Sequence, residues 1–304
     1  KQSLERKTMS QRTYEFGVIT DEIDMDFARA CAVAAELGMS YVELHQAWDK
    51  GIHELTDAEL REAHAILADH SLRTHLVCGM FFRPFSLADV ELATMETHPL
   101  FLEHMQRLER FIEIAHKFNA PNIRTFGFTR DIGGTNPSPR SADGGGMDES
   151  TLARIAKGIQ IACDRLQREG LTLALENARS LYANTGGNMR RVLDAVDRPN
   201  LKIIWDPANA HVAGEDPTTG FKAVQGHIVD VHCKDARVVD NETGLTAWAR
   251  IGDGGTDWVA QLNLLAHVPV QQFTIETHWR GEGIDKAEST RQTFAALKQI
   301  ISQH

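Results

Sequence analysis

Four segments of the sequence each end in a side chain that can bind a metal ion. Each segment is a short, mainly apolar run, and the end residues are Glu176, Asp206, His232 and Glu276. The unbroken run Ile203–Trp205 is typical of a strand covered on both faces, as strands of parallel sheets are. Because the carboxyl ends of parallel strands lie at the same edge of a sheet, we expect the four side chains to converge on one site.

Three carboxylates and one imidazole form an oxygen-rich set of donor atoms. Such a set suits Mn²⁺, Mg²⁺ or another divalent ion better than a structural zinc site, which is rich in thiolates. A single Glu or Asp at the end of a strand is more often a helix cap or a solvated charge. Four such residues at the ends of successive strands instead favour a set of metal ligands, so the sequence predicts a metal site.

The intervening segments predict the elements that must position these residues. Eight runs have the length and composition of strands: 16–20, 41–45, 73–79, 122–128, 171–177, 201–206, 228–232 and 272–276. Segments of helical period lie between them: 25–37, 56–68, 150–170, 189–196, 258–266 and 286–301. The second of these begins with the capping box Thr56-Asp-Ala-Glu59.

Strand–helix units that repeat with no internal boundary predict a (β/α)8 TIM barrel. We expect this α/β barrel to form a single domain over residues 13–304, and residues 1–12 to be a disordered arm or an expression remnant. The alternative is a doubly wound open sheet. No glycine-rich phosphate turn follows the first predicted strand, which disfavours that alternative.

Composition and charge restrict the class of protein. The chain is 42% hydrophobic and 24% charged, and its net charge of −10 argues against a nucleic-acid partner. No run approaches the roughly 18 apolar residues of a membrane span, and the polar amino-terminal stretch lacks a signal core, so a cytoplasmic protein is predicted. The cysteines are far apart and are expected to be buried free thiols: Cys31, Cys78, Cys163 and Cys233.

Two connections are too long to be simple turns. Residues 80–99 follow the third predicted strand and contain Phe81, Phe82 and Phe85, while residues 129–149 follow the fourth and are rich in glycine and proline. Loops that follow the strands of a barrel build its catalytic face, so we expect both near the site. Residues 129–149 are either a surface excursion or a lid that closes over substrate.

The strand ends and the residues beside them resemble a known family. The motifs are Leu-Glu176-Asn177, Trp-Asp206-Pro-Ala-Asn209, Val-His232-Cys-Lys-Asp235, Ile-Glu276-Thr-His278 and the glycine-rich segment Gly252–Trp258. They are similar to those of the xylose-isomerase-like TIM-barrel superfamily, specifically its sugar phosphate isomerases/epimerases. That group includes ketose 3-epimerases, hydroxypyruvate isomerase and inosose dehydratase. The resemblance runs from Phe16 to the last predicted helix.

The resemblance implies one divalent metal ion held by Glu176, Asp206, His232 and Glu276, with Mn²⁺ as the first choice and Mg²⁺, Co²⁺ or Zn²⁺ as alternatives. In the epimerases of the family, two glutamates also face each other across the substrate and move a proton on and off a carbon beside a carbonyl. Carried over, Glu176 and Glu276 are the acid/base pair, acting through a metal-stabilised enediolate. The implied activity is isomerisation or epimerisation of a keto-sugar or related polyol, in carbohydrate metabolism.

Other functions stay open at this point. A lyase, either a dehydratase or an enzyme that cleaves a keto-glycoside, begins with the same proton abstraction and then expels a β-substituent. A non-catalytic sugar-binding barrel is a different class, which the pair Glu176 and Glu276 disfavours. A DNA-repair nuclease, a distant relative with three metals, is disfavoured because Asn209 stands where such relatives have a histidine.

Six residues are candidates for substrate binding: Asn209, His211, Lys234, Arg237, His75 and His278. Lys234 and Arg237 follow the seventh predicted strand, and each either orients the substrate or forms a surface salt bridge. His211 either contacts substrate in place of a family histidine or faces solvent, and His75 lies on the third strand. His278 follows Glu276 on the rim of the predicted barrel.

The expected partner is a small-molecule keto-sugar or polyol, with no nucleic acid and no membrane. An unphosphorylated substrate is favoured, because no glycine-rich anion cradle and no pair of arginines lies near the eighth strand. Trp279, Trp258 and Phe81 are candidates for covering the apolar face of a sugar. Many members of the family pair, so a homo-oligomer is a further expectation, with the Phe-rich residues 80–99 as a candidate pairing surface.

Overall fold

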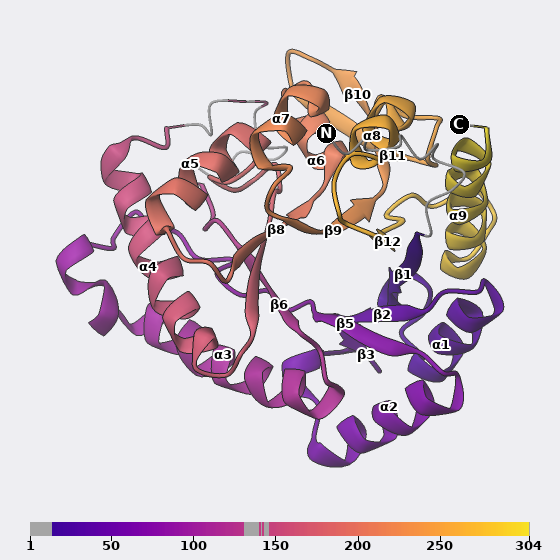
Figure 1. The fold of residues 1–304 in the computed structure, drawn as a ribbon, viewed down its shortest axis with the longest axis horizontal. Coiled ribbons are helices and arrows are strands. Elements are labelled where there is room, and N and C mark those ends of the chain that lie inside the picture. The colour runs from indigo at the N-terminus through magenta and orange to yellow at the C-terminus, as the bar shows by residue number, and fades with distance from the viewer. Residues whose placement is uncertain (1–13, 131–139, 141, 143–145, 304) are drawn as a thin grey trace, which may run out of the picture.

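Eight parallel strands form a closed barrel at the centre of the structure (Figure 1). The computed structural model describes residues 14–130, 140, 142 and 146–303. The barrel strands are β1 (Glu15–Ile19), β2 (Tyr41–Leu44), β5 (Arg73–Val77), β6 (Asn122–Phe126), β7 (Thr172–Glu176), β8 (Leu201–Trp205), β9 (Ile228–Cys233) and β12 (Gln272–Ile275). They follow one another in chain order, and β1 closes the sheet by pairing with both β2 and β12. The predicted (β/α)8 barrel is confirmed, and the ends of each predicted strand lie within two residues of the observed ones.

Helices surround the barrel (Figure 1). Those of the described residues are α1 (Phe27–Glu36), α2 (Asp57–Asp69), α3 (Pro99–Phe118), α4 (Glu149–Gln167), α5 (Gly186–Val196), α6 (Pro207–Ala213), α7 (Pro217–Val224), α8 (Trp258–Leu265) and α9 (Lys286–Ser302). Short 3-10 helices are η2 (Thr20–Glu22), η3 (Ile52–Glu54) and η4 (Leu92–Thr97). The predicted capping box begins α2, because Thr56 and Glu59 exchange hydrogen bonds between side chain and backbone. The predicted helical segments do not include α3, α6 or α7, and the last two are only about two turns long.

A polar layer inside the barrel supports the ends of its strands. The Tyr41 side chain reaches across β1, and its hydroxyl lies 3.0 Å from Oγ1 of Thr274 on β12. Gly17 permits this crossing, since a Cβ at this position would lie 2.1 Å from the Tyr41 ring. Thr274 also donates a hydrogen bond to Glu43, 2.8 Å away on β2. This layer therefore links β2 to β12 across β1, directly beneath the strand ends.

The Phe-rich connection between β5 and α3 is buried. Phe81, Phe82 and Phe85 are at most 1% exposed, and their rings stack with one another, with Phe128 and with His104 of α3. Because the chain itself covers these rings, they are not available to a partner, and residues 80–99 as a pairing surface stay a prediction. Phe81 is likewise too deeply buried to cover a sugar.

A two-stranded hairpin of β10 (Asp235–Asp240) and β11 (Leu245–Ala249) follows β9 (Figure 1). A second, smaller one consists of β3 (Gln46–Ala47) and β4 (Lys50–Gly51). The predicted lid falls largely on residues 131–139, 141 and 143–145, and the predicted arm on residues 1–12, all outside the described part of the chain.

Two further predictions concern burial and the membrane. All four cysteines are buried and free, which confirms the predicted thiols. Among the described residues, no helix combines the length and apolar character that crossing a membrane requires.

Candidate metal and substrate site

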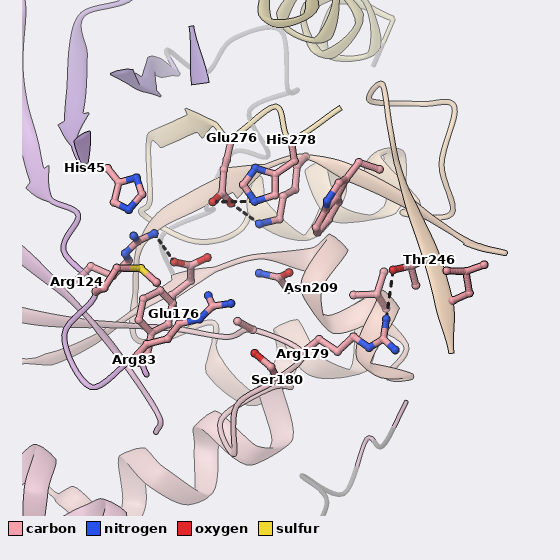
Figure 2. Close-up of a pocket in the computed structure, with 17 residues that line it drawn as sticks. His45, Arg83, Arg124, Glu176, Arg179, Ser180, Asn209, Thr246, Glu276 and His278 are labelled. Atoms are coloured by element: carbon pink, nitrogen blue, oxygen red, sulfur yellow. Dashed lines mark hydrogen bonds and ion pairs between the residues drawn. The ribbon is translucent and has the colours of Figure 1, made fainter. Parts of the chain in front are cut away.

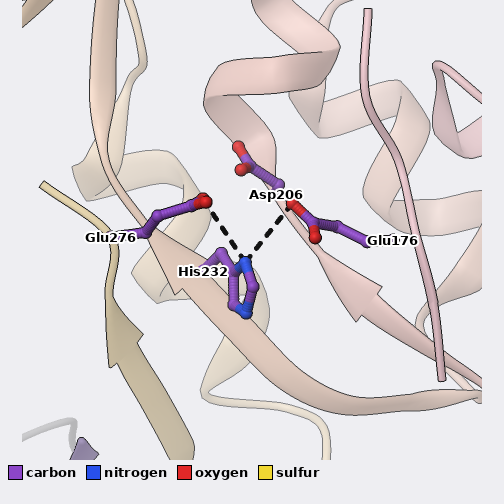
Figure 3. A group of neighbouring side chains, drawn as sticks. All are labelled: Glu176, Asp206, His232 and Glu276. Atoms are coloured by element: carbon purple, nitrogen blue, oxygen red, sulfur yellow. Dashed lines mark ion pairs between the residues drawn. The ribbon is translucent and has the colours of Figure 1, made fainter. Parts of the chain in front are cut away.

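The four predicted metal ligands lie together at the carboxyl ends of their strands (Figure 3). Glu176 is the last residue of β7, Asp206 follows β8, His232 lies near the end of β9 and Glu276 follows β12. Each offers one donor atom, and these atoms all lie within 4.8 Å of one another. All four side chains are buried. Because the four strands are neighbours in a parallel sheet, they deliver these side chains to one point.

His232 lies between the two glutamates of this cluster (Figure 3). Its Nδ1 is 3.4 Å from Oε1 of Glu176 and 3.4 Å from Oε2 of Glu276, and within the described residues this buried nitrogen has no hydrogen-bond partner. Its Nε2 lies 3.2 Å from Oε2 of Glu43. When Nε2 carries the proton and donates it to Glu43, Nδ1 presents a lone pair to the cluster, as a metal-bound histidine does.

Asp206 is both a helix cap and a member of the cluster. Its Oδ1 accepts a hydrogen bond from the backbone N–H of Asn209 at 2.7 Å, which caps α6, and its Oδ2 accepts one from the Asn209 side chain at 2.9 Å. Asn177 ties β7 to β8, because its side chain bonds both the N–H and the carbonyl of Asp206. Asp206 can therefore cap α6 and also be one of the proposed metal ligands.

Lys234 points into the cluster and away from solvent. Its Nζ lies 2.7 Å from Oδ2 of Asp206 and also donates a hydrogen bond to Glu276, and the side chain is buried. The next residue, Asp235, accepts hydrogen bonds from backbone N–H groups of the glycine-rich segment 252–256, which fixes the direction of the chain here. A surface salt bridge is therefore excluded for Lys234.

Burial and neighbouring charges set the protonation of the two glutamates. Burial raises the pKa of Glu276, but the Lys234 ammonium outweighs it and holds the pKa well below the usual value. Burial also raises the pKa of Glu176, and here His232 and Arg124 outweigh it and keep the pKa below the usual value. Both carboxylates are therefore ionised at neutral pH and able to accept a proton.

The other members of the cluster show that it holds a surplus of negative charge. Burial raises the pKa of Asp206 to about 6, although Lys234 opposes this shift. Burial lowers the pKa of His232, but the carboxylates of Glu43 and Glu176 outweigh it and raise the pKa well above the usual value. Acidic side chains that raise the pKa of their neighbours create a negative electrostatic potential. A divalent cation would be stabilised by that potential. The donor set, the charge and the position of Nδ1 between two carboxylates all fit a divalent metal ion, which would displace the proton from that nitrogen.

A cavity of about 700 Å³ opens over the cluster, and Glu176 and Glu276 form part of its wall (Figure 2). This volume is in the range of small-molecule sites. Further polar residues of the lining are His45, Arg83, Arg124, Arg179, Lys234 and His278. The cavity lies where loops after barrel strands build catalytic sites.

Three of the six predicted substrate-binding residues line this cavity: Asn209, Lys234 and His278. Glu22 holds the His278 ring, with Oε1 2.7 Å from Nδ1, while Nε2 lies 3.6 Å from Oε1 of Glu276. These three residues remain candidates for contact with a substrate.

The other three are not among the residues that line this cavity, so their role in substrate binding stays a prediction. His75 is in the middle of β5, with Nε2 3.5 Å from Oδ2 of Asp230, and borders a hollow at the amino-terminal end of the barrel. His211 is half-buried on α6 and packs against Gly255. Arg237 is exposed on β10 and donates a hydrogen bond to a backbone carbonyl. For a strand residue such as His75, alternation along the strand predicts whether the side chain points into the barrel. It does not predict the position of that side chain along the barrel axis.

Arg124 is a part of the site that the sequence reasoning missed. It lies on β6, and its Nη1 donates a hydrogen bond to Oε2 of Glu176 at 2.9 Å. Its Nη2 is held by the carbonyl of Cys78 at 2.8 Å. An arginine inside an otherwise buried strand is a detectable signal, because such a charge requires a partner in the interior.

Trp248 is an aromatic residue in the wall of the cavity. It lies on β11, is 40% exposed, and its ring centroid is 5.3 Å from Nζ of Lys234 and 4.8 Å from the ring of His278. The predicted Trp258 is instead 2% exposed and donates a hydrogen bond to the carbonyl of Lys234. Trp279, also predicted, is not among the residues that line the cavity.

A family model described as "Xylose isomerase-like TIM barrel" matches residues 31–300. The chain belongs to this family. The superfamily predicted from the strand-end motifs is thereby confirmed. Inosose dehydratase of Lacticaseibacillus casei, a curated relative, is 26% identical over 84 residues, and the match spans 28% of this chain and only 28% of the length of that relative.

Solved structures share the barrel of this xylose isomerase-like protein over nearly its whole length. An IOLI protein with a bound zinc atom superposes with a TM-score of 0.74 at 15% identity, covering 95% of this chain and 98% of that chain. The 3-keto-D-glucoside 4-epimerase YcjR of E. coli gives a TM-score of 0.67 at 17% identity, covering 94% and 99%. At these identities the likeness shows a common fold.

Proposed function

We propose that this protein is a divalent-metal-dependent isomerase or epimerase that acts on a keto-sugar or a related polyol. The observation that carries the proposal is the placement of Glu176 and Glu276, two buried carboxylates that flank Nδ1 of His232 and border the same cavity. Inversion at a carbon requires a proton carrier on each face of a planar intermediate, because a single carboxylate returns the proton to the face from which it came.

In this proposal Glu176, Asp206, His232 and Glu276 would hold the metal, with Mn²⁺, Mg²⁺, Co²⁺ and Zn²⁺ as candidates. The buried Nδ1 of His232, which lies between Glu176 and Glu276 and has no hydrogen-bond partner among the described residues, supports the assignment. When bound, the ion supplies Lewis-acid stabilisation of the negative charge that develops on a substrate oxygen. The zinc atom in the IOLI structure is consistent with a metal in this fold.

The residues of the chain supply the proton transfers. One glutamate, ionised, accepts the proton of the carbon beside the carbonyl. The other, which has first taken up a proton from solvent, donates it to the opposite face, and the first then releases its proton to solvent. Arg124 and Lys234 favour the ionised forms of Glu176 and Glu276, so each glutamate serves as the base for one of the two epimers. Asn209 keeps Asp206 in place while this happens.

A lyase is the second candidate function. His278 borders the cavity with Nε2 3.6 Å from Glu276, which places a potential proton donor for a leaving group beside the proposed base. The relative from Lacticaseibacillus casei is a dehydratase. Within the described residues, the 80–99 connection brings Met80 and Arg83 to the cavity, and neither is a general acid, so this connection adds no second proton donor to His278.

The test is proton exchange in deuterated water with ketoses, 3-keto-glucosides and inososes, after chelation and after restoration of Mn²⁺. Metal-dependent deuterium uptake with an epimeric product of otherwise unchanged mass would support the isomerase. A product lighter by water or by a sugar would support the lyase. Absence of exchange with every compound, in protein with metal bound, would contradict both.

A further inference from the structure

The cavity over the cluster is rich in fixed positive charge. Among its lining residues, four side chains are cationic, Arg83, Arg124, Arg179 and Lys234, while only Glu176 and Glu276 are carboxylates. The chain as a whole has a net charge of −10, so this concentration of cations is opposite in sign to the rest of the molecule. A divalent metal ion would add further positive charge to the same wall.

Two of these cations already have acidic partners within the site. Arg124 donates a hydrogen bond to Glu176, and Lys234 contacts both Asp206 and Glu276. Their charges are therefore used in holding the cluster and not in attracting a ligand.

Arg83 has no such partner. Its guanidinium lies over the ring of Phe126, 5.1 Å from the centroid, and the side chain is half-buried. Within the described part of the chain, no acceptor is hydrogen-bonded to this guanidinium and no carboxylate forms an ion pair with it. Burial lowers the pKa of Arg83, and the carboxylates of Glu176 and Glu276 oppose this shift without outweighing it. A half-buried guanidinium directed at a cavity is stabilised most by an anion that enters the cavity.

Arg179 adds a second guanidinium on the side of the cavity next to the hairpin, where its Nη1 donates a hydrogen bond to Oγ1 of Thr246 at 3.2 Å (Figure 2). Burial lowers the pKa of Arg179, and the nearby Arg130 and Arg140 lower it further. Positive charge thus extends from the neighbourhood of Glu176 to the rim of the cavity. Such a field attracts anionic ligands before they bind.

We infer that the substrate carries an anionic group, a carboxylate or a phosphate, which pairs with Arg83. The inference rests on the proposed function and narrows its substrate class from neutral keto-sugars to keto-sugar acids or keto-sugar phosphates. The sequence favoured an unphosphorylated polyol because no arginine pair lies near the eighth strand. In the structure the arginines reach the cavity from the connections after β5 and β7 instead.

The test compares three linear polyols that differ only in charge: D-glucitol, D-gluconate and D-glucitol 6-phosphate. Their affinities are measured by calorimetry on the Mn²⁺-loaded protein, on Arg83→Gln and on Arg61→Gln, which removes an exposed arginine of α2. We expect at least one anion to bind the wild type about ten- to a hundredfold more tightly than D-glucitol. Arg83→Gln should lose most of that preference, whereas Arg61→Gln should keep it and Arg83→Lys should recover part of it.

The affinities also identify the anion, since the tighter of the two charged ligands indicates carboxylate or phosphate. The metal is present in every protein, so a difference between wild type and Arg83→Gln reports the guanidinium and not the ion. Equal affinity for charged and neutral polyols, or an undiminished anion preference in Arg83→Gln, would overturn the inference. In that case, metal-dependent deuterium exchange on a neutral keto-sugar would still support the proposed function. Conversely, anion binding through Arg83 without deuterium exchange on any compound would contradict the proposed function and support the anion site alone.

Discussion

The carboxylate of Glu43 lies 3.2 Å from Nε2 of His232, on the side of the imidazole that faces away from Glu176 and Glu276. Both side chains are fully buried. Burial raises the pKa of Glu43, but the neighbouring His232 outweighs it and keeps the pKa below the usual value. An ionised Glu43 accepts a hydrogen bond from the protonated Nε2, so that a metal ion that displaces the proton from Nδ1 meets a more basic nitrogen. Glu43 thus supports the candidate metal site without being one of its four proposed ligands.

Replacement of Glu43 should weaken metal binding. Glu43→Gln keeps the shape but removes the charge beside His232, so we expect the affinity for Mn²⁺ to fall about ten- to a hundredfold. Metal titration followed by calorimetry checks this, with Glu62→Gln on the exposed face of α2 as the control. An affinity equal to that of the wild type would show that Glu43 is a structural acid only.

Lys234 should stabilise the metal-free protein more than the metal-bound protein. Its ammonium contacts Asp206 and Glu276, and Lys234→Met would leave these buried carboxylates uncompensated, at a cost of about 3–5 kcal/mol in the free energy of unfolding. A metal ion replaces part of the lost charge, so the rise in melting temperature on adding Mn²⁺ should be larger in the variant than in the wild type. The exposed Lys222→Met serves as the control, and equal metal-induced shifts would contradict the assignment.

Substitution of Glu176 and substitution of Glu276 should each abolish proton exchange for a different epimer. If each serves one face of the substrate, Glu276→Gln and Glu176→Gln both lose net epimerisation by at least about a hundredfold. Each variant should still exchange the proton of one epimer with deuterated solvent, and the two variants should retain opposite epimers. Nuclear magnetic resonance of each purified epimer, on protein with confirmed metal content, gives the answer. The same residual exchange in both variants would show that a single base acts on both faces.

Trp248 should contribute to substrate binding and little to the chemical step. Its half-exposed ring lies beside Lys234 and His278 at the cavity wall. Loss of a stacking surface worth about 1 kcal/mol or slightly more predicts a five- to tenfold higher KM for Trp248→Ala, with a smaller change in kcat. Trp248→Phe should retain most of the affinity. A decrease in kcat at constant KM would instead assign Trp248 to the reaction itself.

His104 should make the protein less stable in acid. Burial lowers its pKa to about 4 from a usual value of 6.5, and the backbone N–H of Phe82 donates a hydrogen bond to Nδ1 at 3.1 Å, which requires this nitrogen to be unprotonated. The unfolded chain therefore takes up a proton below about pH 6.5, whereas the folded chain does so only near pH 4. Stability is complete above pH 6.5 and falls by about 3 kcal/mol as the pH decreases to 4. Denaturant unfolding at several pH values should show this loss, and His104→Asn, which keeps an acceptor, should flatten it.

The sequence by itself determined the barrel and the cluster of four strand-end residues. Strand lengths, helical periods and caps are local signals that the sequence shows directly. In a parallel barrel all strands run in the same direction, so their carboxyl ends lie at the same edge. Glu176, Asp206, His232 and Glu276 could therefore be predicted to meet from their positions alone, and the structure places them within 4.8 Å of one another.

Only the tertiary structure decided which other side chains join them. His75 points into the barrel, as alternation allows, but at the wrong height, and Lys234 turns inward because the glycine-rich segment folds around Asp235. Arg83 reaches the cavity through a connection whose path depends on the packing of its Phe side chains. These outcomes depend on contacts between residues far apart in the chain, which periodicity and spacing do not encode.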